Sequence, residues 1–189
     1  MKQGRIIFLE GVSSAGKTTL AKALQARLPE PFFWLAGDTI WMMAPEKFKN
    51  DMDVIFPKID AATINTIKLF SDLGIDLIVD IVPVIKSNKK FAKMLRKCPV
   101  LYVNVTCPPE ELRRRERERG DRQLGLGESQ LAGLSPQGMY DITVDTHSST
   151  SEECADRIME MLNGFGKYNR SKRIARLRLT ISRDWDIIK

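Results

Sequence analysis

A glycine-bounded loop between a predicted strand and a predicted helix limits the possible folds of this chain more than any other feature. Residues 5–9 (RIIFL) form a short β-branched run, which predicts a buried strand. Residues 11–18 (GVSSAGKT) then fit the pattern G-x-x-x-x-G-K-[ST] without deviation. Leucines at helical spacing in residues 17–28, closed by Pro29, predict that a helix follows the loop directly.

This order of elements favours a loop that binds the phosphates of a nucleoside triphosphate such as ATP. The glycines let successive backbone N–H groups converge on the phosphates, and the positive end of the helix dipole lies beneath them. Lys17 is expected to neutralise the β- and γ-phosphates, and Thr18 to offer its hydroxyl to Mg²⁺. The alternative is a strand-to-helix turn without a ligand. The predicted nucleotide-binding residues are Gly11, Val12, Ser13, Ser14, Ala15, Gly16, Lys17, Thr18 and Thr19.

Asp80 is the predicted partner of Thr18 at the metal. It follows the apolar residues 77–79 (LIV), so we expect it near the carboxyl end of a buried strand, as in a Walker-B segment. Thr18 and Asp80 are therefore the predicted Mg²⁺ ligands. The alternative for Asp80 is an ordinary helix-capping or loop aspartate.

Apolar runs and helical patterns alternate along the chain, which predicts an α/β fold with a doubly wound parallel sheet of the P-loop, small-kinase type. Without a linker long enough to separate two domains, residues 1–166 are expected to form one domain. Further strands are expected at residues 32–36, 75–82, 100–105 and 141–144, and further helices at 57–73, 86–97, 108–119 and 150–162.

The positive charge of the chain is concentrated at its end. The formal net charge is +6, but residues 167–189 hold eight basic and two acidic residues, which leaves 22 of each sign in residues 1–166. The body is therefore no generic polyanion binder. Residues 175–182 (ARLRLTIS) alternate apolar and polar side chains, which predicts a half-buried strand that pairs with the central sheet or with a second protomer. A mobile tail is the alternative.

Other features exclude several classes of protein. Cys98, Cys107 and Cys154 lack metal-ligand spacing, and the lone His147 excludes a His-rich metal site. No apolar run approaches the ~18 residues of a membrane span. The N-terminal residues show no signal-peptide cleavage site, so a cytoplasmic protein with reduced thiols is expected.

Asp38 is the candidate general base. It follows the predicted strand 32–36, where a carboxylate can take the proton of an acceptor hydroxyl. The local sequence supports an N-cap for residues 39–43 equally well.

A run of arginines, residues 113–122 (RRRERERGDR), precedes a glycine-rich stretch. Arg113 and Arg114 are expected to form Glu–Arg pairs on a solvated helix, together with Glu118. Arg119 and Arg122 flank the point where the helical pattern breaks. They are expected to belong to a helical lid, about residues 113–138, that closes over ATP, excludes water and brings a guanidinium to the γ-phosphate. The sequence does not rank the two arginines.

Taken together, these residues resemble the chloramphenicol phosphotransferase-like family of small P-loop kinases over residues 5–163. The resemblance implies ATP-dependent phosphorylation of a small-molecule hydroxyl, with Asp38 as general base. Leu134-Ser135-Pro136 replaces a region where the founding type carries a histidine, and residues 41–57 are distinctive, so the acceptor need not be chloramphenicol. The matching residues are GVSSAGKT (11–18), LPEP (28–31), Asp38, Asp80, Arg115-Glu116, RGDR (119–122), Gly125, Gln130, Tyr140-Asp141, VDT (144–146), Ser151 and ECA (153–155).

Three functions remain open at this point. The first is a small-molecule O-kinase that uses ATP and Mg²⁺, including antibiotic modification. The second is a nucleoside, nucleotide or nucleic-acid 5′-hydroxyl kinase, which the basic tail favours and the neutral body opposes. The third is a nucleotide-dependent RNA-binding protein, whose affinity for RNA would fall steeply with salt. The sequence has no guanine-specifying N-K-x-D segment, which argues against a GTPase switch.

The loop assignment predicts that ATP with Mg²⁺ raises the melting temperature. A ligand that binds only the native state stabilises it by about 2.7 kcal/mol at a hundred times its Kd. Lys17→Ala should remove most of this shift, because the phosphates lose the cation that neutralises them. Thermal denaturation of both proteins with and without MgATP checks the prediction, and an equal shift in the two would contradict it.

Overall fold

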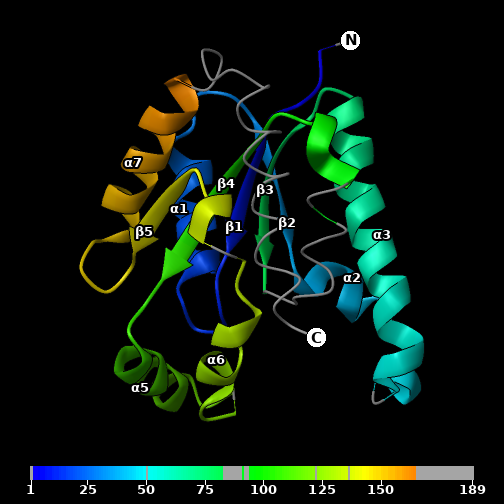
Figure 1. The fold of residues 1–189 in the computed structure, drawn as a ribbon, viewed down its shortest axis with the longest axis vertical. Coiled ribbons are helices and arrows are strands. Elements are labelled where there is room, and N and C mark those ends of the chain that lie inside the picture. The colour runs from blue at the N-terminus through cyan, green and yellow to red at the C-terminus, as the bar shows by residue number, and fades with distance from the viewer. Residues whose placement is uncertain are drawn as a thin grey trace.

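Five parallel strands form one sheet in the order β2-β3-β1-β4-β5 (Figure 1). The computed structural model describes residues 2–49, 51–82, 91, 94–121, 123–135 and 137–164. The parallel order with β1 in the centre confirms the predicted α/β fold. The strands are β1 (Ile6–Glu10), β2 (Phe32–Ala36), β3 (Asp76–Ile81), β4 (Val100–Thr106) and β5 (Ile142–Asp145).

Helices cover both faces of the sheet (Figure 1). α1 (Lys17–Arg27) and α7 (Ser151–Gly164) pack on one face, and α3 (Met52–Asp72) packs on the other. Three helices lie at the carboxyl end of the strands: α2 (Asp38–Met42), α5 (Pro109–Arg119) and α6 (Leu126–Ser129). Short 3₁₀ turns occupy Glu46–Phe48, Leu95–Lys97, Leu131–Gly133 and Gln137–Met139. Within the described ranges, every helix is too short or too polar to traverse a lipid bilayer.

The central strand β1 supplies side chains to two hydrophobic cores. Ile7 and Leu9 belong to the core beneath α1 and α7, whereas Ile6 and Phe8 belong to the core beneath α3. Successive side chains of a strand point to opposite faces, so a strand buried on both faces favours apolar residues at every position. The apolar run from Ile6 to Leu9 follows from the place of β1 in the middle of the sheet, and the buried Glu10 ends the strand.

Helix α3 begins earlier than the sequence indicated. The predicted start at Pro57 is wrong, because the helix starts at Met52 and includes this proline. Asp51 caps the helix, its side chain accepting a hydrogen bond from the backbone N–H of Val54 at 3.3 Å. A proline removes one backbone donor, and here the cap and the buried Ile55 outweigh that loss.

Two predicted elements lie largely outside the described residues. Of the helix expected at residues 86–97, the described part includes the 3₁₀ turn at Leu95–Lys97. The basic tail, residues 167–189, with the strand expected at 175–182, falls entirely outside.

The register of the sheet brings three strand ends together. Asp80 of β3 pairs with Leu9 of β1 on one side and with Ala36 of β2 on the other. Because all three strands run in the same direction, the residues that follow Leu9 and Ala36 emerge beside Asp80. The glycine-bounded loop and Asp38 therefore meet at the same edge of the sheet.

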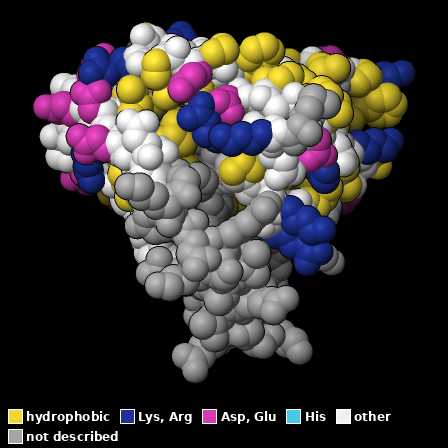
Figure 2. Space-filling model, turned by 90° about the horizontal axis from the view of Figure 1, so that it is seen from above, with side chains coloured by type: hydrophobic (Ala, Val, Ile, Leu, Met, Phe, Trp, Pro, Cys, Tyr) yellow, Lys and Arg dark blue, Asp and Glu magenta, His cyan; other side chains and the backbone are white. Residues whose placement is uncertain are grey.

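On one face of the described structure, charges of both signs are mixed. Figure 2 shows Lys and Arg side chains interspersed there with Asp, Glu and hydrophobic side chains. Among the described residues that this view shows, basic side chains are thus separated by acidic and uncharged ones.

A buried carboxylate attaches α6 to α5. Glu116 of α5 is 1% exposed, and its two oxygens accept the backbone N–H groups of Gly125 at 2.7 Å and Gly127 at 2.8 Å. Helix α5 ends at Gly120, whose positive φ of 67° reverses the chain toward these glycines. Within the predicted lid, the buried Glu116 thus holds the start of α6 against α5.

Glu116→Ala should destabilise the protein by about 2–4 kcal/mol, because two N–H groups lose a charged acceptor in a buried setting. Glu118→Ala is the matched control, since Glu118 lies on the same helix and pairs with Arg114 at the surface. A surface pair contributes about 0–1 kcal/mol. Urea denaturation measures both variants, and equal losses in the two would show that the buried carboxylate is not the anchor.

Candidate active site

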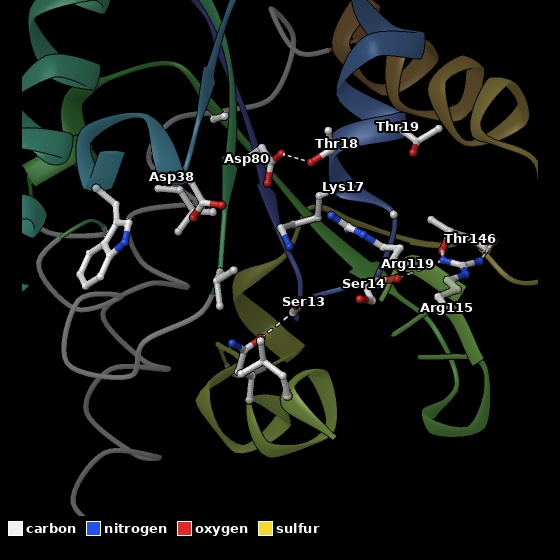
Figure 3. A pocket seen from close by; sticks show the side chains of 18 of the residues that line it. Ser13, Ser14, Lys17, Thr18, Thr19, Asp38, Asp80, Arg115, Arg119 and Thr146 are labelled. Atoms are coloured by element: carbon white, nitrogen blue, oxygen red, sulfur yellow. Dashed lines mark hydrogen bonds between the residues drawn. The ribbon is translucent and has the colours of Figure 1, made fainter. Parts of the chain in front are cut away.

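A cavity of about 740 Å³ opens at the carboxyl end of the sheet (Figure 3). The loop after β1, the α2–α3 region and the α5–α6 region form its walls. In Figure 3, Asp38 and Asp80 lie on one side of Lys17, and Arg115 and Arg119 lie on the other. The lining residues include Ser13, Ser14, Gly16, Lys17, Thr18, Thr19, Asp38, Trp41, Phe56, Ile59, Asp60, Thr63, Asp80, Arg115, Glu118, Arg119, Leu126, Gln130 and Thr146.

The loop at residues 11–18 has the backbone that its glycines predict. Gly16 has a φ of 89°, and a Cβ at Gly11 would lie 2.5 Å from the carbonyl oxygen of Val105. Ser14 also adopts a positive φ, 62°, which is rare for a residue other than glycine. Such a loop turns tightly enough for its N–H groups to face one point.

Two polar side chains of the loop fit an anionic ligand. Lys17 is 6% exposed and donates from Nζ to the carbonyl oxygen of Val12 at 2.9 Å. The buried hydroxyl of Ser14 has no hydrogen-bond partner in the described part of the chain. A buried hydroxyl and a buried ammonium at the same cavity provide donors for the oxygens of a phosphate.

Thr18 and Asp80 are in contact, as the sequence predicted. The hydroxyl of Thr18 donates to Oδ2 of Asp80 at 2.9 Å. Asp80 is 5% exposed, and burial raises the pKa of its carboxyl above the ordinary value of 3.8. Lys17 and the Thr18 hydroxyl lower this pKa in part, whereas the negative charge of Asp38 raises it further.

This pair fits Mg²⁺ bound together with phosphates. Mg²⁺ prefers oxygen ligands and usually takes only one or two from the protein, the rest coming from water and phosphate. Thr18 and Asp80 offer hydroxyl and carboxylate oxygens of this kind. Among the described residues, no group of three or more His, Cys, Asp and Glu side chains forms a separate metal centre.

Asp38 lines the cavity from the first turn of α2. The N-cap position of this helix falls on Gly37, one residue before Asp38. A Cβ at Gly37 would lie 2.7 Å from the carbonyl oxygen of Asp80, so the two strand ends approach closely at this point. Asp38 is therefore brought toward Asp80 by backbone packing.

The arginines of α5 have different surroundings. Arg119 lines the cavity and pairs with Asp121, with its Nε 3.2 Å from Oδ1. Arg122 lies outside the described residues, so the choice between Arg119 and Arg122 stays open.

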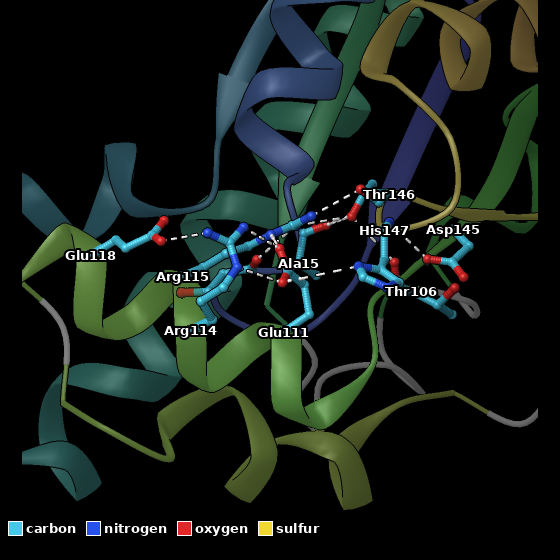
Figure 4. Close-up of polar contacts among 10 residues, drawn as sticks. Ala15, Thr106, Glu111, Arg114, Arg115, Glu118, Asp145, Thr146 and His147 are labelled. Atoms are coloured by element: carbon cyan, nitrogen blue, oxygen red, sulfur yellow. Dashed lines mark hydrogen bonds and ion pairs between the residues drawn. The ribbon is translucent and has the colours of Figure 1, made fainter.

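The predicted surface pairs are confirmed. Arg113 pairs with Glu128 at 2.6 Å, and Arg114 pairs with Glu111 and Glu118 (Figure 4). These arginines stabilise the surface of α5.

Arg115 joins α5 to the phosphate loop and to the end of β5 (Figure 4). Its guanidinium donates to the carbonyl oxygen of Ser14 at 3.3 Å, and to the hydroxyl and carbonyl oxygens of Thr146 at 3.0 and 2.8 Å. Thr146 in turn donates from its hydroxyl to the carbonyl oxygen of Ala15 at 2.8 Å. The sequence showed Arg115 and Thr146 only as matching positions of a family pattern, without this contact.

Two further lining residues were not assigned a role from the sequence. Asp60, 8% exposed, faces the cavity from α3, and Gln130 accepts a hydrogen bond from the backbone N–H of Ser13 at 2.7 Å. An aspartate inside an amphipathic helix and a glutamine after a short helix carry no local signal. Their positions depend on how α3 and α6 pack against the loop.

Comparisons with known proteins agree with this geometry. The sequence model of the chloramphenicol phosphotransferase-like protein family matches residues 4–163. "Putative O-phosphotransferase Rv2636" of Mycobacterium tuberculosis is 29% identical, covering 85% of this chain and 83% of the relative. The adenylyl-sulfate kinase of Clostridium acetobutylicum is also 29% identical, covering 85% and 84%.

A solved structure shares the fold. The APS kinase CysC of Mycobacterium tuberculosis, in complex with AMPPNP and APS, superposes with a TM-score of 0.66 at 15% identity. The match covers 86% of this chain and 99% of that one.

The raised pKa of Asp80 predicts a pH-dependent affinity for Mg²⁺–nucleotide. Only the ionised carboxyl binds Mg²⁺, and a raised pKa means that it takes up its proton at a higher pH than an exposed aspartate does. As the pH falls, the gain in nucleotide affinity caused by Mg²⁺ should therefore shrink at a higher pH than an exposed aspartate would allow. Protonation of Asp80 also stabilises the native state without nucleotide against unfolding, because burial penalises the charged carboxylate.

Calorimetric titrations with and without Mg²⁺ measure this gain. Asp80→Asn is the control that corrects for titration of the nucleotide itself, and the gain should be small in this variant at every pH. Identical pH profiles for the wild type and Asp80→Asn would contradict the assignment of Asp80.

Proposed function

Because the chain belongs to the chloramphenicol phosphotransferase-like family and is a P-loop phosphotransferase, we propose that it transfers the γ-phosphoryl group of ATP to a hydroxyl group of a small molecule. One observation carries the proposal: a single cavity contains the phosphate loop at one end and the carboxylate of Asp38 at the other. Phosphoryl transfer needs a donor and an acceptor hydroxyl to meet between such groups.

The phosphate loop is the proposed donor site. Its backbone N–H groups and the N-terminus of α1 bind the inner phosphates, and Lys17 reaches the phosphoryl group that is transferred. Thr18 and Asp80 hold Mg²⁺, which when bound withdraws charge from the phosphate oxygens. Arg115 and Thr146 fix the loop from outside, so that its donors are already oriented before the nucleotide arrives.

Asp38 is the proposed general base. Its carboxylate faces the same cavity as Asp80, on the side of Lys17 away from Arg119. An acceptor hydroxyl that binds there donates its hydrogen bond to Asp38 and directs its oxygen toward the phosphoryl group. Asp38 then takes the proton as the acceptor oxygen bonds to the γ-phosphorus, while the bond from that phosphorus to the β–γ bridging oxygen breaks and ADP leaves.

The residues of α2 and α3 are the proposed acceptor site. Trp41, Phe56 and Ile59 offer an apolar wall, and Asp60 and Thr63 place polar groups beside it. A pocket with these features suits a small molecule that carries both apolar parts and hydroxyl groups, as a phenicol antibiotic does. Ser135 is used structurally, because it donates to the buried Glu10, from N at 3.0 Å and from Oγ at 3.1 Å.

Residues 113–138 are the proposed lid. Arg119 extends from it into the cavity, where a guanidinium stabilises the charge of the transferring group. A closed lid keeps water from taking the place of the acceptor, which would turn the kinase into an ATPase. Residues 1–166 form the proposed kinase domain.

Asp38→Asn should lower kcat by roughly 10²–10⁴, because the amide keeps the shape of the side chain but does not accept a proton. The affinity for ATP should hardly change. Transfer of label from [γ-³²P]ATP to phenicol, aminoglycoside, nucleoside and sugar acceptors identifies the substrate and measures this loss.

Asp53→Asn is a suitable control, since Asp53 lies in the exposed first turn of α3. If Asp38→Asn keeps turnover within a few-fold of the wild type, Asp38 is not the base. If label passes to RNA or to a 5′-hydroxyl end instead of a small molecule, the proposed acceptor class is wrong.

A further inference from the structure

A backbone donor of the phosphate loop is occupied by a side chain of the proposed lid. The N–H of Ser13 donates to Oε1 of Gln130 at 2.7 Å, and the two residues are joined by a dashed line in Figure 3. A backbone N–H only donates, so the atom that faces it must be the carbonyl oxygen of the glutamine amide. This assignment is fixed by chemistry, unlike most side-chain amide orientations.

The packing of α6 places Gln130 at this point. Glu116 holds the N–H groups of Gly125 and Gly127, and the backbone at Gly127 lies against the loop so closely that a Cβ would be 2.6 Å from the carbonyl oxygen of Ser13. Gln130 follows directly after this helix. The segment directly before Gln130 is thus attached both to α5 and to the phosphate loop.

The side-chain oxygen of Gln130, which accepts the hydrogen bond from this N–H, marks the position of a phosphate oxygen. The N–H groups of a G-x-x-x-x-G-K-[ST] loop bind phosphate oxygens, and both Ser13 and Gln130 line the cavity. An oxygen 2.7 Å from the nitrogen of Ser13 therefore stands where such a phosphate oxygen would stand. One N–H makes one strong hydrogen bond, so Gln130 and a phosphate compete for it.

The competing phosphate is the outermost one. The inner phosphates lie over the N-terminus of α1, which starts at Lys17. Ser13 precedes this helix by four residues and lies toward α6, on the lid side of Lys17 in Figure 3. A nucleoside triphosphate reaches this donor with its terminal phosphate, and a diphosphate ends before it.

We propose that Gln130 is a positioning residue that occupies the Ser13 N–H in the empty protein and yields it to the terminal phosphate of a bound nucleoside triphosphate. The proposal rests on the proposed function, because it requires the loop to bind a nucleotide. The exchange keeps a buried donor satisfied in both states. It also links the lid segment to the length of the phosphate chain, since a diphosphate leaves the bond to Gln130 intact.

Two substitutions should change triphosphate affinity in opposite directions. Gln130→Ala removes the side chain that competes with the terminal phosphate. The Kd for MgATP should then fall roughly three- to tenfold, which corresponds to the free energy of one net hydrogen bond. The Kd for MgADP should stay the same. Gln130→Glu keeps the shape but adds a negative charge that accepts more strongly and repels the phosphate. The Kd for MgATP should then rise at least about tenfold, and the Kd for MgADP by less.

Isothermal titration of the full chain with MgATP and MgADP tests both variants. Gln137→Ala is the control, since Gln137 is exposed and does not line the cavity. On an identified acceptor, Gln130→Ala should lower KM for ATP with kcat unchanged, because it alters ground-state and transition-state binding equally.

Several outcomes overturn the proposal. Weaker MgATP binding in Gln130→Ala, or equal changes for the two nucleotides in both variants, would make Gln130 an ordinary structural contact. If Gln130→Ala does not fold, Gln130→Glu carries the test through its ATP-to-ADP affinity ratio, which must fall. A wild-type protein that binds neither nucleotide would overturn the proposed function itself.

Discussion

The hydrogen bond between Thr18 and Asp80 joins the two elements on which the site depends. It connects the first turn of α1 to the end of β3, and the sheet register then places the ends of β1 and β2 on either side. Burying the Asp80 carboxylate has a free-energy cost, visible as a raised pKa, which the Thr18 hydroxyl and the charge of Lys17 offset in part. Asp80 is thus a buried carboxyl with partners that favour its charged form, at the point where a cation is expected to bind.

Buried carboxylates also hold the segment above the loop. Glu116 binds two backbone N–H groups before Gln130, and Glu10, 2% exposed at the end of β1, binds the N–H and the hydroxyl of Ser135 after it. Both carboxylates have their donors in the same segment, which is therefore ordered against β1 and α5 without a ligand. The proposed lid is a preorganised wall, and its exchange of partners is local to Gln130.

The acceptor half of the cavity follows from the early start of α3. Because Asp51 caps the helix before Pro57, Phe56 stands on a helical turn and lines the cavity together with Asp60 one turn later. The proposed acceptor site thus depends on how α2 and α3 stand beside the phosphate loop. This division suits a set of related proteins whose names include an O-phosphotransferase and adenylyl-sulfate kinases.

The sequence by itself determined the parallel α/β fold and the phosphate loop between a strand and a helix. Strand alternation, helical spacing and a loop whose glycines are required by close backbone contacts are local properties, and local properties are encoded in neighbouring residues. The clamp made by Arg115 and the contact of Gln130 with the loop were decided only by the tertiary structure. Arg115 contacts residues 31 and 101 positions away, and Ser13 and Gln130 are 117 positions apart. Contacts over that distance arise from how helices pack on the finished sheet, and no neighbouring residue records them.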